Sequence, residues 1–400
     1  MTAWRRNIAL FLSSQGISML GSSIVQYAIM WHITLTTQSG LMMTLYIICG
    51  FLPTFFLSPF AGVWADRYNR KKLIMLADGG IAISTLILAI LFLLGYQYIW
   101  LLFIIAAIRA FGAGVQGPAV GAILPQIVPE EKLMRVNGIN GTVQAAIMFI
   151  APMISAALLT VTTLEMILFI DVVTAAFAIA TLLLIRIAKH EVSAAPVSYL
   201  EDFKSGLSYI QSTPFLKHYF LFIAILFFLM APASFLTPLQ VTRTFGEEVW
   251  RLTAIELAFS AGMMVGGAVI AAWQGFQNRV YTMVFGGIIF SVCTIALGIM
   301  PSFWPYIAVM AICGVAIPIF NTPTMTLLQE KVDPAYIGRI FGVFNMIASA
   351  MMPLGMLLFG PLADAVSIQL ILIITGVAML LLIGALYFNK TLVREGLKVS

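Results

Sequence analysis

The last long apolar run of the chain reads IQLILIITGVAMLLLIGALYF, residues 368–388, and it contains no charged side chain. A helix needs about 20 apolar residues to cross the hydrocarbon core of a bilayer, because it rises about 1.5 Å per residue. A β-barrel strand would instead alternate polar and apolar residues over about 10 positions. No such alternation occurs in this run, so it predicts a membrane-spanning helix.

Runs of the same kind recur along the whole chain. Apolar stretches bounded by charge, Gly or Pro predict twelve spans. The predicted spans cover residues 8–35, 41–62, 73–95, 99–120, 139–160, 164–186, 215–240, 252–273, 280–299, 303–328, 337–362 and 368–388. Only 9% of the 400 residues are charged, against about 25% in soluble domains, which excludes a water-soluble globular protein. The sequence therefore predicts an all-α membrane protein.

The composition also excludes several kinds of chemistry. Cys49, Cys293 and Cys313 all lie inside apolar runs, so no disulfide framework and no cysteine metal site is expected. The sequence contains no Gly-x-x-x-x-Gly-Lys-Ser/Thr phosphate loop, no His-Glu-x-x-His and no Gly-x-Ser-x-Gly. We therefore expect no enzymatic activity, no metal and no cofactor. Any work that the protein does must draw on an ion gradient or on the substrate gradient itself.

Basic residues indicate how the chain is oriented. Eighteen of the 21 Lys and Arg residues lie in the two tails and in the even-numbered loops, whereas the odd-numbered loops hold only Arg243 and Arg251. The remaining cation, Arg109, lies within a span. By the positive-inside rule both termini face the cytoplasm, as in a multi-pass protein of the cell membrane. The net charge of +5 thus reflects topology, and no nucleic-acid partner is expected.

The longest predicted loop divides the chain into two groups of six spans. The expected domains are residues 1–187 and 215–400, joined by a cytoplasmic linker at 188–214. Prolines such as Pro152 and Pro353 recur at corresponding places in the two halves. Two pseudo-symmetric six-helix bundles are typical of transporters in which the bundles rock about a central site.

The linker contains apolar residues at helical spacing. They alternate with charged residues, and the set is Leu200, Glu201, Asp202, Phe203, Lys204, Leu207 and Ile210. This spacing predicts an amphipathic helix on the membrane surface, with an unstructured connector as the alternative.

Ionised side chains inside the bilayer cost several kcal/mol, so each one calls for a reason. Arg109 lies near the midplane of the fourth span, Asp171 lies roughly 10 Å into the sixth, and Glu256 lies four residues into the eighth. A carboxyl group in a poorly hydrated site can load and release a proton as water access alternates, so these three residues are the proton-coupling candidates. Alternatively, Asp171 pairs with a cation or polar group and Glu256 faces water. Asp78 and Asp364 are expected to reach the interface.

A substrate cavity is expected where spans of the two halves meet. Candidate lining residues are the polar or soft side chains Gln26, Tyr27, Tyr46, Gln116, Gln144, Met148, Met263, Asn321, Asn345 and Met352. Methionine and aromatic side chains adapt to many shapes, whereas sugars and amino acids need dense hydrogen bonding. The set therefore favours a bulky amphipathic ligand, and the alternative for each residue is packing against helices or lipid.

The loop between the second and third spans carries a family signature. It reads GVWADRYNRKK, residues 62–72, and resembles the Gly-x-x-x-Asp-Arg-x-x-Arg-Lys/Arg loop of the major facilitator superfamily. The resemblance implies the twelve-helix fold of that superfamily. It also implies a gating role for Gly62, Asp66, Arg67, Arg70 and Lys71. For the last two cations, a role in topology alone is the alternative.

More narrowly, the chain resembles the macrolide-efflux branch of that superfamily, among the proton-linked drug exporters. Residues 15–22, 109–112 and 329–339 carry this likeness, and Arg109 matches an intramembrane arginine that the family associates with proton coupling. Ala151-Pro152 stands where exporters often have Gly-Pro, which leaves uptake open beside export.

The leading functional hypothesis is a monomeric secondary exporter in contact with membrane lipid, exchanging bulky amphipathic compounds for protons by alternating access. One alternative is a transporter of lysophospholipid or a siderophore from a related branch. Another is a receptor-like member or channel without coupled turnover, which would not need the gating loop.

Overall fold

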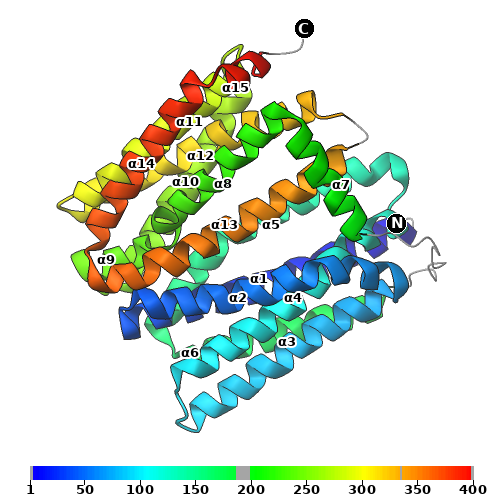
Figure 1. The fold of residues 1–400 in the computed structure, drawn as a ribbon. Helices are drawn as coiled ribbons and strands as arrows, with labels where there is room; N and C mark the ends of the chain where they lie inside the picture. The colour runs from blue at the N-terminus through cyan, green and yellow to red at the C-terminus, as the bar shows by residue number, and fades with distance from the viewer. Residues whose placement is uncertain (1–2, 186–198, 334–335, 398–400) are drawn as a thin grey trace. The chain divides into compact units, whose positions relative to one another are not determined.

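The computed structural model describes residues 3–185, 199–333 and 336–397, and it is almost entirely helical over these ranges (Figure 1). The surroundings of a few residues within helices, among them Gly62 and Asp66, lie outside the described part. The helices are α1 (Ala3–Thr37), α2 (Gly40–Arg67), α3 (Arg70–Leu93), α4 (Ile99–Ile127), η1 (Glu130–Lys132), α5 (Leu133–Val161), α6 (Leu164–Leu183), α7 (Tyr199–Ser212), α8 (Pro214–Phe235), α9 (Thr237–Phe245), α10 (Val249–Trp273), α11 (Arg279–Ile299), α12 (Phe303–Lys331), α13 (Ile337–Ala365), α14 (Ile368–Phe388) and α15 (Lys390–Glu395).

Twelve helical segments of the described chain are long and apolar enough to cross a bilayer, which confirms the predicted number of spans. Several of them begin before the apolar run that predicted them: α3 starts at Arg70 although its apolar run starts at residue 73. A helix continues through charged residues at the membrane surface because its backbone hydrogen bonds do not depend on apolar side chains. The seventh span differs again, because it consists of α8 and α9, which meet at Leu236.

The predicted linker helix is present as α7, residues Tyr199–Ser212. It packs against α13 and α8, and Figure 1 shows it as the short green helix beside the orange α13. Tyr209 of α7 stacks on Tyr336, with ring centroids 4.4 Å apart. Residues 188–198 of the predicted linker lie outside the described ranges.

The chain divides into two compact units. Unit 1 comprises residues 1–36 and 45–196, and unit 2 comprises residues 37–44 and 197–400. The short segment 37–44, which includes the start of α2, thus belongs with the second half of the chain. The predicted domain limits stay a prediction.

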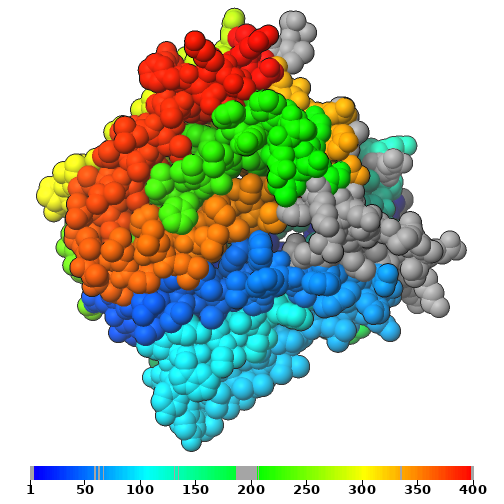
Figure 2. Space-filling model, viewed as in Figure 1, coloured from blue at the N-terminus to red at the C-terminus, as the bar shows by residue number. Residues whose placement is uncertain are grey.

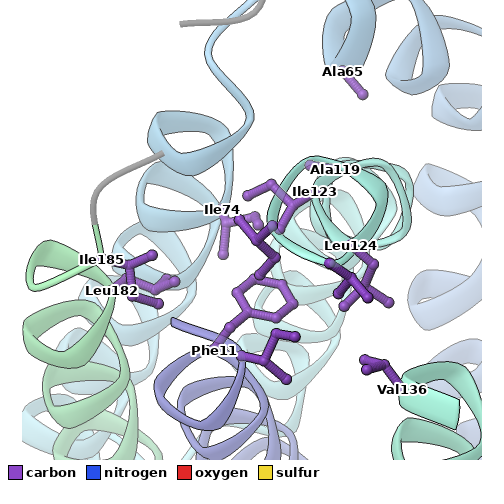
Figure 3. Packing of buried hydrophobic residues seen from close by; sticks show 12 residues of the cluster. Phe11, Ala65, Ile74, Ala119, Ile123, Leu124, Val136, Leu182 and Ile185 are labelled. Carbon is purple, nitrogen blue, oxygen red and sulfur yellow. The ribbon is translucent and has the colours of Figure 1, made fainter. Parts of the chain in front are cut away.

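The core of unit 1 is an apolar cluster contributed by six helices. Phe11 of α1, Ile74 of α3 and Ile123 of α4 point toward one another at its centre (Figure 3). Leu182 of α6 and Val136 of α5 extend the cluster on either side. This packing fixes α1, α3 and α4 next to one another, which places their polar residues at shared depths.

Unit 2 depends on close backbone contact between α10 and α12. A methyl group added at Gly262 would lie 2.0 Å from the carbonyl oxygen of Ala311, and one added at Gly266 would lie 2.3 Å from that of Val315. The spacing of four residues places both glycines on one face of α10. In lipid, where helix association relies on van der Waals packing, such small residues let two backbones approach closely.

The outer faces of the helices carry large apolar side chains. Leu370, Ile374 and Leu381 of α14 are exposed, as are Leu354 and Leu357 of α13. These two helices form the red and orange surface in Figure 2. Continuous apolar surface of this extent is what a bilayer covers, and a soluble monomer exposes much smaller patches.

The glycine contact leads to a direct test. Gly266→Ala should destabilise the protein by about 1–3 kcal/mol, because the new methyl group clashes with backbone that cannot turn aside. Gly267→Ala is the matched control, since a methyl group there has no neighbour within 4 Å. Thermal unfolding in detergent should show a lower Tm for the first variant and an unchanged or higher Tm for the second. Equal Tm values would contradict the close α10–α12 contact.

Candidate functional site

Four helices of unit 1 bring together a buried ion pair, named here the Arg109 cluster (Ser22, Thr85, Arg109 and Asp171). Arg109 Nη1 donates to Asp171 Oδ2 and, at 3.0 Å, to Thr85 Oγ1, while Nη2 donates to the carbonyl oxygen of Ser22 at 3.0 Å. Ser22 Oγ and Thr85 Oγ1 donate to the carboxylate oxygens of Asp171 at 2.9 and 3.2 Å. The side chains of Asp171 and Arg109 are 1% and 11% exposed.

The geometry explains how two charges are tolerated so deep in a span. Each carboxylate oxygen of Asp171 accepts at least one hydrogen bond, and Arg109 is held by the three other members of the cluster. A buried ion pair needs such additional hydrogen bonds because desolvation otherwise exceeds the Coulombic attraction. The structure thus brings two of the three predicted coupling residues into contact, and their role in coupling stays a prediction.

The third predicted coupling residue, Glu256, lies elsewhere. It belongs to α10 in unit 2 and is half-buried. Within the described ranges it has no hydrogen-bond or ion-pair partner. Its neighbour Ile255 is fully buried, so the carboxyl group lies at the edge of the packed face of α10.

A second polar group lies on the same helices, named here the Asp78 cluster (Gln15, Ser18, Asp78 and Gln116). Asp78 is 3% exposed, so the expectation that it reaches the interface is wrong. Its Oδ1 accepts hydrogen bonds from Ser18 Oγ at 2.8 Å and Gln116 Nε2 at 2.9 Å. Gln116 Nε2 also lies 3.4 Å from Gln15 Oε1. Because α3 already begins at Arg70, Asp78 lies deeper in the helix than its distance from the apolar run indicates.

The two clusters follow each other along three helices. On α1 Ser18 is one turn from Ser22, on α3 Asp78 is two turns from Thr85, and on α4 Gln116 is two turns from Arg109. At about 1.5 Å per residue the step along α3 is roughly 10 Å. Unit 1 therefore holds two acidic sites at different depths, and only one of them contains a cation.

The signature loop is built into unit 1 by its basic residues. Arg70 donates to the carbonyl oxygens of Ala65 and Ala122, each at 2.8 Å. Lys71 Nζ donates to the carbonyl oxygens of Leu183 and Ile185 at 3.1 and 2.8 Å, at the C-terminal end of α6. Cations at a helix C-terminus satisfy free carbonyl groups and the helix dipole.

The remaining residues of the signature are placed less fully. Arg67 ends α2 and is exposed, while Gly62 and Asp66 lie outside the described part except as backbone of α2. Asn69 caps α3 by accepting a hydrogen bond from the backbone N–H of Lys72 at 3.1 Å. The gating role of the loop stays a prediction.

The predicted cavity residues have different surroundings. Tyr46 is buried and donates to the carbonyl oxygen of Gln26 at 3.2 Å, and Gln116 belongs to the Asp78 cluster. Exposed members are Gln26, Gln144, Met148, Asn321 and Asn345, and half-buried members are Tyr27, Gln116, Met263 and Met352. Contact with a substrate stays a prediction for all of them.

One polar site of unit 2 has no counterpart in the sequence predictions. Asp364, at the end of α13, accepts hydrogen bonds from the backbone N–H groups of Gly40 and Leu41 at 2.7 and 2.9 Å and from Ser39 Oγ at 2.7 Å. Arg243 pairs with Asp364 at 2.8 Å. Asp364 thus caps α2, a helix that begins 324 residues earlier. Residue spacing carries no signal for such a distant cap.

Twelve membrane-crossing helices with charges paired inside them define a polytopic membrane protein of the transport class. The chain belongs to the Major Facilitator Superfamily, whose sequence pattern matches residues 7–356. It is a transporter and not an enzyme.

Individual relatives agree with this assignment. The chain is 28% identical to macrolide efflux protein A of Streptococcus pyogenes over 370 residues, which cover 92% of this chain and 91% of the relative. It is 26% identical to the enterobactin exporter EntS of Escherichia coli O127:H6, covering 94% and 90% of the two chains. The fold matches a bacterial homologue of the human lysosomal transporter Spinster, solved inward-facing and unoccupied, with a TM-score of 0.72, 15% identity and full coverage of both chains.

The ion pair of the Arg109 cluster predicts non-additive stability effects. Arg109→Met or Asp171→Leu alone should cost about 3–5 kcal/mol because each leaves a buried charge unpaired, whereas the double variant should cost less than either. Glu248→Gln is the control: its carboxyl is 53% exposed and pairs with Arg251, so its loss should cost about 0–1 kcal/mol. Thermal unfolding in detergent measures all four. Additive costs in the double variant would contradict the pair.

Proposed function

We propose that the protein is a secondary active exporter of bulky amphipathic compounds, of the macrolide or multidrug type, which exchanges its substrate for protons. The observation that carries the proposal is the buried Arg109–Asp171 pair in unit 1. A charge pair that is costly to bury needs a reason beyond stability, since apolar residues would pack there at lower cost. Export is supported by the printed activities of macrolide efflux protein A and EntS.

The pair suggests how a proton could be coupled to transport. Protonation of Asp171 removes the negative charge that holds Arg109, leaving the arginine bonded to Thr85 and to the carbonyl oxygen of Ser22. Two arrangements of the cluster, paired and released, would then follow the proton occupancy of one carboxyl group. Glu256 is the second proposed coupling residue, because a half-buried carboxyl without a partner can exchange protons as its hydration changes.

The substrate class is proposed from the softness of the available side chains. Met148, Met263 and Met352 are accessible at their surfaces, with few amides beside them, among which are Gln144 and Asn345. Flexible thioethers accommodate large apolar bodies, and sparse amides provide orientation without demanding a fixed pattern of hydroxyl groups. We propose these residues as substrate contacts.

The proposal includes the orientation and the mechanical parts of the transporter. Both termini face the cytoplasm of the cell, and alternating access moves the six-helix halves, residues 1–187 and 215–400, against each other. The loop of Gly62, Asp66 and Arg67 gates this motion, with Arg70 and Lys71 anchoring it. The transporter works as a monomer in the cell membrane, without a cofactor.

Siderophore transport is the second candidate, favoured by one specific observation. The likeness to EntS covers nearly the whole chain at 26% identity, close to the likeness to macrolide efflux protein A. The related alternatives, lysophospholipid transport and a receptor-like member, have no such relative in support. Siderophores are polar chelators, so competition assays separate them from macrolides.

Accumulation assays in cells test the proposal. Expression should lower the steady-state level of a radiolabelled macrolide or a lipophilic dye severalfold, and a protonophore should restore it, because the gradient supplies the energy. Asp171→Asn should abolish export and leave binding of the compound to purified protein measurable. Glu248→Gln, an exposed carboxyl outside the Arg109 cluster, should export normally.

The outcomes separate the alternatives. Unchanged accumulation across macrolides, dyes and a ferric siderophore, with the protein present in the membrane, would sink the export proposal. Export that is lowered only for the siderophore would favour the second candidate. Export by Asp171→Asn at the wild-type rate would reject the coupling role of the ion pair while leaving export itself intact.

A further inference from the structure

We propose that Asp78 is a proton-binding site of unit 1, separate from the Arg109–Asp171 pair, and that it carries a transported proton. The part of this inference that concerns transport rests on the proposed function. The part that concerns proton binding rests on the geometry of the Asp78 cluster alone. The site takes one proton onto a carboxylate oxygen, giving a neutral carboxylic acid, and returns it.

Hydrogen-bond accounting shows the first reason. Oδ1 of Asp78 accepts two hydrogen bonds, from Ser18 and Gln116. Oδ2 is buried and has no partner among the residues that the structure describes. An ionised carboxylate with one bare oxygen in a span is costly, because hydrocarbon supplies no donor in place of water. A proton on Oδ2 removes the charge and turns the bare acceptor into a donor.

The charges around the cluster give the second reason. Asp78 faces Ser18 and Gln15 of α1 and Gln116 of α4, and none of these carries a charge. The charged groups of the packed helices that face it are Arg109 on α4 and Asp171 on α6, which neutralise each other. The two acids of unit 1 therefore differ in kind: Asp171 keeps its charge by pairing with a cation, whereas Asp78 has no counter-ion in its own cluster.

The amide of Gln15 provides for both protonation states. Its Nε2 is buried and has no partner within the described residues, and its Oε1 lies 3.4 Å from Gln116 Nε2. An amide both donates and accepts hydrogen bonds. A small rotation of Gln15 would therefore satisfy Asp78 Oδ2 in either state, by donation to the carboxylate or by acceptance from the acid.

Access for the proton lies on the side of the amides. Gln15 and Gln116 are half-buried, whereas Asp78 and Ser18 are buried. A proton that enters past the two amides meets Asp78 before the Arg109 cluster, which lies roughly 10 Å farther along α3. A site of this kind can be occupied in one hydration state and emptied in another without breaking the ion pair.

Infrared difference spectroscopy on purified protein in lipid nanodiscs tests proton binding directly. Stepping from about pH 5.5 to about pH 8.5 leaves exposed carboxyls, with pKa values near 4, almost fully ionised throughout. We expect the C=O band of a protonated carboxylic acid to disappear over this step in the wild type. The band should be lost entirely in Asp78→Asn and kept in Asp171→Asn. A band that persists in Asp78→Asn overturns the inference, as does its absence from the wild type.

Two further variants keep the test decisive if Asp78→Asn does not fold. Asp78→Glu should keep a titrating band. Ser18→Ala removes one donor to the ionised form, so the band should persist to higher pH than in the wild type. An unchanged titration in Ser18→Ala would contradict the assignment. The titration should also be the same when sodium is replaced by choline, and a dependence on sodium would assign the site to that cation and overturn the proposal.

Failure of this inference is distinguishable from failure of the proposed function. If the band belongs to Asp78 but cells show no gradient-driven export, proton binding stands and the exporter proposal fails. If export depends on the gradient and Asp78→Asn exports with unchanged dependence on it, the transport role of Asp78 fails and the exporter proposal stands.

Discussion

Hydrocarbon provides no compensation for a charge or a free hydrogen-bonding group, and the arrangement of unit 1 depends on how this constraint is met. Arg109 can lie deep in α4 only because Asp171 of α6 balances its charge and because Ser22 and Thr85 supply the remaining hydrogen bonds. The same four residues tie α1, α3, α4 and α6 to one another. The helix packing and the candidate chemistry of this unit therefore have a common origin.

Unit 2 is held together by different means. Its closest helix contact is backbone against backbone at Gly262 and Gly266, and its clearest ionic contact, between Arg243 and Asp364, lies at a helix end. No ion pair of the Arg109 kind is present in the part of unit 2 that the structure describes. The two units have matching numbers of spans but differ in where they place charge, which assigns the proposed proton chemistry mainly to unit 1.

Much of the fold follows from the sequence because a span is a local property. About 20 apolar residues predict a transmembrane helix whatever surrounds them. Partners are not local: the burial of Arg109 and Asp171 was predictable from depth, but their contact depends on which helices are neighbours. Asp78 was misplaced because the apolar run begins three residues after α3 does, and because only packing decides which face of a helix is buried.

The central claim is that a proton gradient drives substrate movement through this protein. Transport in proteoliposomes with an imposed pH gradient measures it most directly, since direction, coupling ion and substrate are set by the experimenter. The account predicts that a macrolide accumulates against its own concentration gradient on the acidic side, and that collapsing the pH gradient stops this accumulation. Equal transport with and without the pH gradient, in either direction, would contradict it.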